Sequence, residues 1–141
     1  MYNFRKEIES ILKLKGISPT PIRILVLYCL KDAECPLSLS DLEQRLQTID
    51  KSSISRALNL FREKHVVHFF NDNSGSTKYE LCKSTSHTTC NDSHLHFHCR
   101  ICGETLCLMD ISLPLIELPE GFERENENFI ISGICNKCHK N

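Results

Sequence analysis

Hydrophobic residues in the first part of the chain recur at the spacing of amphipathic helices. In "NFRKEIESILKLKG" they run from Phe4 to Leu14 at roughly helical intervals, and Gly16 follows as a natural C-cap. In "TPIRILVLYCLKDA", Thr20 and Pro21 suit the N-cap and the first position of a second helix. The pattern therefore predicts two successive helices before residue 35.

Two further helices are predicted before the pattern changes. In "SLSDLEQRLQ" either Ser38 or Ser40 can serve as the N-cap, and in "DKSSISRALNLFREK" either Asp50 or Ser52 can do so. The apolar residues of the second segment fall on one stripe, which is typical of a helix with one buried face.

After these helices the hydrophobic period becomes that of strands. "HVVHFFND" and "STKYELC" are joined by the turn-rich "NDNSG", which predicts a β-hairpin. Short helices followed by such a hairpin outline a winged helix, whose last helix enters the DNA major groove. A helical bundle capped by a hairpin fits the same pattern. Basic residues on or near the last helix favour DNA modestly: Lys51, Arg56, Arg62 and Lys64.

Composition narrows the class of protein. The chain has 141 residues and a formal net charge of −1, which excludes a strongly basic nucleic-acid coat but allows a local basic face. It contains no apolar run long enough to cross a membrane and no signal-peptide pattern, so we expect a cytoplasmic protein. Nine cysteines in a reducing compartment point to metal binding rather than to a disulfide framework.

The strongest chemical signal is a pair of C-x-x-C motifs. "CRIC" contains Cys99 and Cys102, and "CNKC" contains Cys135 and Cys138. Two thiolates separated by two residues can grip one ion across a tight turn, and two such turns complete a tetrahedral site that suits Zn²⁺. We therefore expect a structural zinc bound by four cysteines. The alternative is a redox dithiol, but neither motif has a thioredoxin-like context.

Alternating histidines precede the first of these motifs. His94, His96 and His98 fall on one face of a predicted strand, since successive side chains of a strand alternate. The four-cysteine site needs no histidine, so His94 and His96 are candidates for a second metal site. Cys107, on the strand returning from the first motif, can reach the same side. Ordinary surface histidines are the alternative.

The ordered set of motifs resembles the ferric uptake regulator (Fur) family of metal-dependent bacterial transcriptional repressors. The resemblance rests on motifs along almost the whole chain: "T-x-x-R" at Thr20–Arg23, "LSLSDLEQRL", "SISRAL" at Ser53–Leu58, "GSTKYEL", "HLHFHCRICG" and "GICNKC". It implies an α+β protein, with an N-terminal winged helix-turn-helix followed by a small α/β dimerisation domain that carries a four-cysteine zinc knuckle. The corresponding boundaries are a DNA-binding domain at 1–82, a linker at 83–93 and a metal-binding dimerisation domain at 94–141.

The resemblance also assigns roles to residues. It implies a homodimer that binds double-stranded operator DNA when loaded with metal, with no membrane and no small-molecule substrate. Cys99, Cys102, Cys135 and Cys138 match the structural zinc ligands. The expected regulatory ligands are Glu80, Cys82, His94, His96 and Cys107. The expected DNA-binding residues are Arg23, Lys51, Ser53, Ser55 and Arg56.

The sequence departs from the family pattern at several positions. Ser55 replaces the tyrosine of the recognition helix, and Pro36 stands where a histidine is expected. The positions of the accessory regulatory site carry Ser93, Leu95 and Glu127, so we expect that site to be absent. The region "LPLIELPEG", where the family has a dimerisation helix, is short and bounded by prolines.

The ligand set favours a zinc sensor. Thiolates select Zn²⁺ over Fe²⁺, and Cys107 lies where iron and peroxide sensors carry Glu or Asp. In addition, "YELC" resembles the Tyr-x-x-Cys of zinc-uptake regulators. The alternatives are an iron- or peroxide-sensing member of the family, or a zinc-binding interaction module that does not bind DNA. The chain contains neither H-E-x-x-H nor a deaminase motif, so we expect no enzyme.

Overall fold

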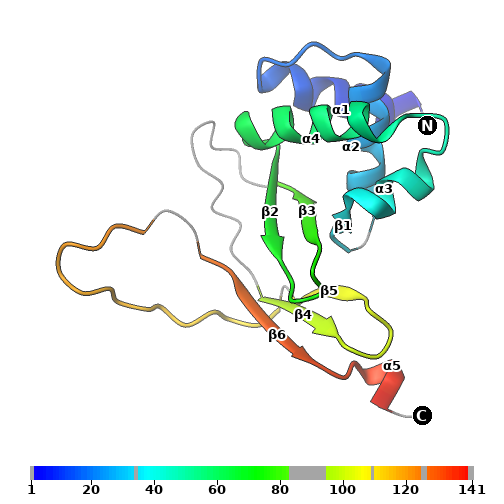
Figure 1. Cartoon of the computed structure of the whole chain (residues 1–141). Helices are drawn as coiled ribbons and strands as arrows, with labels where there is room; N and C mark the ends of the chain where they lie inside the picture. The colour runs from blue at the N-terminus through cyan, green and yellow to red at the C-terminus, as the bar shows by residue number, and fades with distance from the viewer. Residues whose placement is uncertain (1, 34, 83–94, 109, 125–126, 140–141) are drawn as a thin grey trace.

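The computed structural model describes residues 2–33, 35–82, 95–108, 110–124 and 127–139. Figure 1 shows a helical half joined by a long hairpin to a second, smaller sheet. In chain order the elements are α1 (Tyr2–Leu14), α2 (Pro21–Asp32), β1 (Leu37–Ser38), α3 (Leu39–Arg45), α4 (Lys51–Glu63), β2 (Val67–Asn71), β3 (Thr77–Leu81), β4 (Leu95–Cys99), β5 (Thr105–Leu108), β6 (Phe129–Gly133) and α5 (Asn136–His139).

The helices begin and end where their capping residues dictate. Gly16 follows α1 with a φ of +74°, a conformation that glycine adopts without strain. Thr20 caps α2 and Asp50 caps α4. Of the two serines available to α3, Ser38 is the cap, because its hydroxyl accepts from the Asp41 N–H and the Asp41 carboxylate accepts from the Ser38 N–H.

The main hydrophobic core lies in the helical half. Apolar side chains from α1, α2 and α4 meet there and are almost completely shielded from water, among them Ile8, Leu12, Leu27, Ile54, Leu58 and Phe61. Because α4 is anchored through this one buried stripe, its opposite face remains available to solvent.

The helical half carries a three-stranded sheet in the order β1-β3-β2. The hairpin strands β2 and β3 are antiparallel, and their far end reaches the second sheet (Figure 1). The two-residue strand β1 was not expected from the sequence; it pairs Leu37 with Tyr79 and Ser38 with Lys78. Four helices, with the short strand between the second and the third, followed by a hairpin form a winged helix.

The second sheet has the order β5-β4-β6. Strand β4 is central, antiparallel to β5 and parallel to β6. Helix α5 follows β6 directly and spans four residues. The predicted α+β class is therefore confirmed.

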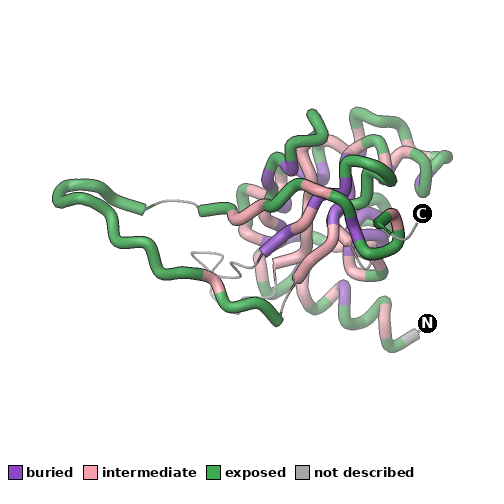
Figure 2. The backbone as a smooth tube through the Cα atoms, turned by 90° about the horizontal axis from the view of Figure 1, so that it is seen from below, coloured by how far each residue is buried: buried purple, intermediate pink, exposed green. Residues whose placement is uncertain are grey.

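Residues 110–124, between β5 and β6, contain no helix and extend away from both sheets (Figures 1 and 2). We call this segment the arm. Figure 2 shows it as exposed along almost its whole length, and it carries large apolar side chains at Ile111, Leu115, Ile116, Leu118 and Phe122. The segment where the family has a dimerisation helix is thus extended here, and prolines at both ends of "LPLIELPEG" disfavour a helix between them.

Residues 83–93, predicted as a linker, lie outside the described part of the chain. Among the described residues, no helix has the length and apolar character needed to cross a membrane.

Candidate metal centres and DNA-binding face

The four cysteines of the C-x-x-C motifs converge at one end of the second sheet. Cys99 ends β4, Cys102 lies in the turn that follows, Cys135 lies between β6 and α5, and Cys138 lies in α5. Their four sulfur atoms all lie within 4.8 Å of one another, and Cys102 Sγ is 3.9 Å from Cys135 Sγ. This is the spacing of ligands around a single small ion.

The thiols of this cluster titrate very differently from one another. Backbone N–H groups of Cys102 and Cys135 lower the pKa of the Cys99 thiol to about 6. The Cys135 side chain, together with lost hydration, raises the pKa of Cys138 to about 12. Four crowded sulfur atoms therefore do not all ionise near neutral pH by themselves. A bound Zn²⁺ would supply the charge that stabilises four thiolates, so the donor set fits the expected structural zinc.

A second cluster forms where the hairpin meets the second sheet. Glu80 of β3, His96 of β4 and Cys107 of β5 offer ligand atoms that all lie within 4.8 Å of one another. The Cys107 thiol donates to Glu80 Oε1 at 2.8 Å, and His96 Nε2 lies 3.0 Å from Glu80 Oε2. A carboxylate, an imidazole and a thiol thus converge from two different sheets.

The register of the strands explains why these side chains meet. His96 pairs with Cys107 across β4 and β5, so the two side chains point to the same face. The His96 ring is buried and stacks on Phe70 of the hairpin, with ring centroids 4.0 Å apart. Packing therefore fixes the imidazole before any ion binds, which favours a specific metal geometry.

His68 also contacts this cluster. It pairs with Glu80 across β2 and β3, and its Nε2 lies 2.9 Å from Glu80 Oε2. His68 was not among the metal ligands expected from the sequence. The hairpin register would have placed it opposite Glu80, but a single sequence does not fix that register.

Two of the other predicted regulatory ligands are not part of the described cluster. His94 lies outside the described residues. Cys82 follows β3 and is disulfide-bonded. His98, which the strand pattern places on the same face as His96, is buried and hydrogen-bonds with Thr105.

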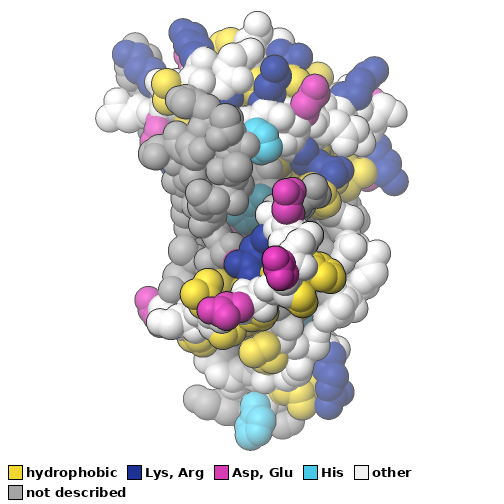
Figure 3. Space-filling model, turned by 90° about the vertical axis from the view of Figure 1, so that its left-hand side faces the viewer, with side chains coloured by type: hydrophobic (Ala, Val, Ile, Leu, Met, Phe, Trp, Pro, Cys, Tyr) yellow, Lys and Arg dark blue, Asp and Glu magenta, His cyan; other side chains and the backbone are white. Residues whose placement is uncertain are grey.

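Four of the five predicted DNA-binding residues lie on α4. Lys51 and Arg56 are exposed, while Ser53 and Ser55 are half-buried on the same helix. The Asp50 carboxylate accepts hydrogen bonds from the Ser53 N–H and hydroxyl, and Arg56 donates to the Ser53 hydroxyl at 3.3 Å. Figure 3 shows Lys and Arg side chains gathered mainly over the helical half of the molecule.

Arg23 does not lie on α4. It belongs to α2 and donates from its guanidinium to the Ser18 carbonyl at 2.9 Å. Arg23 would therefore contact DNA from α2, beside the contacts that α4 makes.

Residues 15–132 match the family model of the ferric uptake regulator family. Because the match covers most of the chain, the chain belongs to this family. It is a metal-responsive DNA-binding transcription regulator, with an N-terminal DNA-binding domain and a C-terminal dimerisation domain. The resemblance stated from the motifs is thereby confirmed.

Solved structures with the same fold include regulators of several metals. The Helicobacter pylori ferric uptake regulator, described as having three functional metal-binding sites, is 16% identical with a TM-score of 0.63, covering 98% of this chain and 93% of that one. A zinc uptake regulator complexed with zinc and DNA is 18% identical with a TM-score of 0.66, covering 99% and 95%. A zinc-bound manganese uptake regulator is 17% identical with a TM-score of 0.65, covering 91% and 98%.

At these identities the structural likeness establishes the fold alone. No match was found among the curated proteins. The choice of metal must therefore be argued from the residues of this chain.

Proposed function

We propose that this protein is a zinc-responsive repressor, in which Zn²⁺ binding between the hairpin and the second sheet switches operator binding. The observation that carries the proposal is the contact of the Cys107 thiol with the Glu80 carboxylate, 2.8 Å apart and beside His96. A regulatory centre that combines a thiolate, an imidazole and a carboxylate suits Zn²⁺ better than Fe²⁺ or Mn²⁺.

Glu80, His96 and Cys107 would hold the ion, and His68 is placed to offer a fourth donor. A bound zinc ion would supply the positive charge that draws the Glu80 carboxylate and the Cys107 thiolate together. His94 remains a proposed ligand, and Cys82 is a proposed ligand only in the form in which its disulfide is reduced. The other zinc is assigned to Cys99, Cys102, Cys135 and Cys138, where it stabilises the fold.

The proposed switch follows from where the ligands come from. Glu80 and His68 belong to the winged helix, whereas His96 and Cys107 belong to the second sheet. Any ion held by both groups limits how far the hairpin can move over that sheet. This biases the angle between the two DNA-binding halves of a dimer towards the spacing of two half-sites.

We assign DNA contact to α4 and its neighbours. Lys51 and Arg56 provide positive charge for phosphates, and Ser53, Ser55 and Arg23 complete the proposed set. A serine replaces the usual tyrosine at position 55, so the operator sequence should differ from those read by relatives that retain it. A regulator of this kind would act in the cytoplasm, on double-stranded DNA and without a small-molecule substrate.

The arm supports the proposed homodimer. Its apolar side chains, including Leu115 and Phe122, are exposed in the single chain, as is Ile131 of β6. Exposed apolar area on this scale is typical of a surface that a second subunit covers.

The test of the metal assignment is a DNA-binding titration under anaerobic conditions. Duplexes are first selected from a random-sequence pool by protein loaded with Zn²⁺, Fe²⁺ or Mn²⁺, and their binding is then followed by fluorescence anisotropy against each buffered free metal ion. We expect Zn²⁺ to induce binding at a far lower free concentration than the other two. A response to Fe²⁺ alone, with Zn²⁺ confined to the four cysteines, would move the protein to the iron or peroxide branch.

A further inference from the structure

The hairpin contacts the second sheet at two rungs of the β4–β5 ladder that lie on the same face, with the Phe97–Leu106 pair between them. The first rung pairs His96 with Cys107 and contacts Glu80, which is the proposed regulatory centre. The second rung pairs His98 with Thr105. This second rung also receives a carboxylate from the hairpin, that of Asp72.

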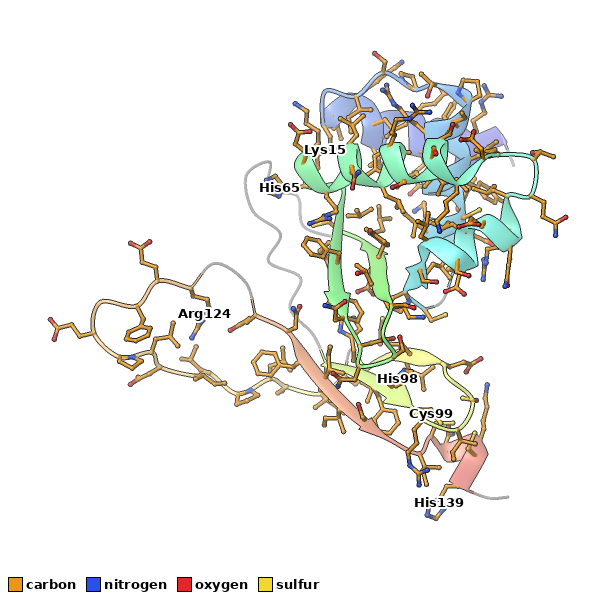
Figure 4. All side chains as sticks on the ribbon, viewed as in Figure 1. Lys15, His65, His98, Cys99, Arg124 and His139 are labelled. Carbon is orange, nitrogen blue, oxygen red and sulfur yellow. The ribbon has the colours of Figure 1, made fainter. Side chains whose placement is uncertain are left out.

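Asp72 lies in the hairpin turn and has no exposed surface at all. Its Oδ1 accepts from the Ser74 N–H at 3.0 Å and from the Ser74 hydroxyl, and its Oδ2 accepts from the Thr105 hydroxyl. Thr105 Oγ1 lies 3.1 Å from His98 Nδ1, and that nitrogen is 3.6 Å from Asp72 Oδ2. Figure 4 shows His98 where the far end of the hairpin meets β4.

The two rungs differ in the groups that surround the negatively charged carboxylate. Around Glu80 are a thiol and imidazoles, which are good ligands for a divalent ion. Around Asp72 are hydroxyl groups, the His98 imidazole and the ammonium of Lys78, which lies 3.9 Å from Asp72 Oδ2 and 3.7 Å from the Asp41 carboxylate. Hydroxyl groups bind Zn²⁺ poorly, and this rung offers a single imidazole and no thiolate. Lys78 therefore provides part of the positive charge that the buried carboxylate needs without any metal ion.

We propose that Asp72, Thr105 and His98 form a metal-independent contact that positions the hairpin on the second sheet. The contact holds Glu80 within reach of His96 and Cys107 before the ion binds, so that the regulatory centre is largely preformed. Asp72 and Thr105 are then positioning residues for the switch rather than ligands. The consequence for DNA binding rests on the proposed function, but the contact itself can be measured without DNA.

Because the Asp72–Thr105 contact is buried, it should hold the hairpin on the sheet more strongly than a neighbouring exposed hydrogen bond does. A hydrogen bond to a buried charged group is worth about 1.5–3 kcal/mol, and removing one partner leaves the carboxylate underpaired. Another hydrogen bond also joins the two domains, from Asn73 Nδ2 to Ser132 Oγ at 3.2 Å, but it is exposed to water. Ser132→Ala is therefore a matched control, because it removes a hydroxyl from the same sheet near the same turn.

The test compares Thr105→Val, Thr105→Ser and Ser132→Ala with wild type. Each protein keeps zinc in the four-cysteine site, and the regulatory centre is emptied with a mild chelator. Hydrogen exchange of the peptide spanning residues 71–79 is measured by mass spectrometry. We expect Thr105→Val to accelerate exchange by about tenfold or more, the equivalent of one charged hydrogen bond, whereas Thr105→Ser and Ser132→Ala resemble wild type.

The second readout is the free Zn²⁺ concentration at which the selected duplex binds. It should rise about tenfold in Thr105→Val, because zinc must then order the hairpin as well as bind to it. Asp72→Ala removes the same contact from the hairpin side and should give the same two changes.

The outcomes separate the two proposals. Unchanged exchange and an unchanged zinc midpoint in both Thr105→Val and Asp72→Ala would overturn the positioning role and leave the zinc switch intact. If wild-type protein binds no duplex in response to zinc, the proposed function fails. The exchange result then decides by itself whether Asp72 and Thr105 hold the hairpin.

Discussion

Cys102 is the exposed member of the four-cysteine cluster and lies in the turn after β4. The second sheet buries few side chains among its described residues: Leu95, His96, His98, Cys99, Thr105 and Cys135. So small a core supplies little stability, and a metal bound by four thiolates compensates for it in domains of this size. The cluster joins the ends of β4 and β6, the two strands that pair in parallel.

Cys102→Ser should therefore unfold the C-terminal domain selectively. We expect loss of one zinc per subunit and rapid proteolysis of residues 95–139, while the helical half keeps its own core and its helical signal. Zinc content by mass spectrometry and protease mapping provide the measurement. Cys35→Ser, at a half-buried cysteine outside both metal clusters, is the control and should behave as wild type. Retention of zinc and of a folded second domain in Cys102→Ser would refute the structural role.

At the scale of elements, α4 is the part of the winged helix best placed to meet DNA. Its buried stripe packs on α2 and α3, and its N-terminus is fixed by Asp50. The hydrogen bond of Arg56 to Ser53 keeps the guanidinium on the exposed side of the first two turns. This geometry presents a positive charge along the helix that the family resemblance identifies as the recognition helix.

Arg56→Ala should weaken zinc-dependent duplex binding and reduce the salt dependence of the affinity. If Arg56 contacts one phosphate, the slope of log affinity against log salt should fall by about 1. Fluorescence anisotropy at several salt concentrations measures this slope. The control is Arg5→Ala, in α1, whose side chain pairs with Glu9 on the surface. A slope that is unchanged in Arg56→Ala would argue against phosphate contact at this position.

Local patterns predicted most elements, because helices and hairpins are encoded by nearby residues. Short local motifs indicated the helix caps at Thr20 and Asp50 and the turn "NDNSG". Strand β1 could not, since two residues carry no period and its pairing with Tyr79 is formed only in the folded chain.

Among the candidate sites, too, local spacing could be read from the sequence but contacts between strands could not. The four-cysteine cluster follows from spacing within each C-x-x-C motif, so the sequence alone indicated it. His68 and Asp72 were missed because their partners lie on other strands, at distances along the chain that a single sequence does not relate. Only the register of β2 with β3, and the position of the hairpin on the second sheet, reveals these contacts.

At the scale of the whole molecule, polar contacts at Glu80 and Asp72 and the exposed Asn73–Ser132 hydrogen bond join the domains within the described part of the chain. The contact at Glu80 uses groups that suit a metal ion, whereas the contact at Asp72 already has hydroxyl donors and the nearby ammonium of Lys78. The contact at Glu80 should therefore change when metal binds, whereas the contact at Asp72 should stay the same. A small change at the regulatory centre can then become a change in the angle of the DNA-binding half, since the hairpin is continuous with α4 through residues 64–66.

The central claim is that the ion held by Glu80, His96 and Cys107 controls DNA binding separately from the zinc that maintains the fold. The most direct measurement is the zinc-dependent duplex affinity of His96→Ala beside wild type, with His139→Ala, an exposed histidine in α5, as the matched control. We predict that His96→Ala remains a folded dimer with one zinc per subunit and no longer gains affinity on addition of zinc, while His139→Ala responds as wild type does. A full zinc response in His96→Ala, or its global unfolding, would contradict the separation of the two sites.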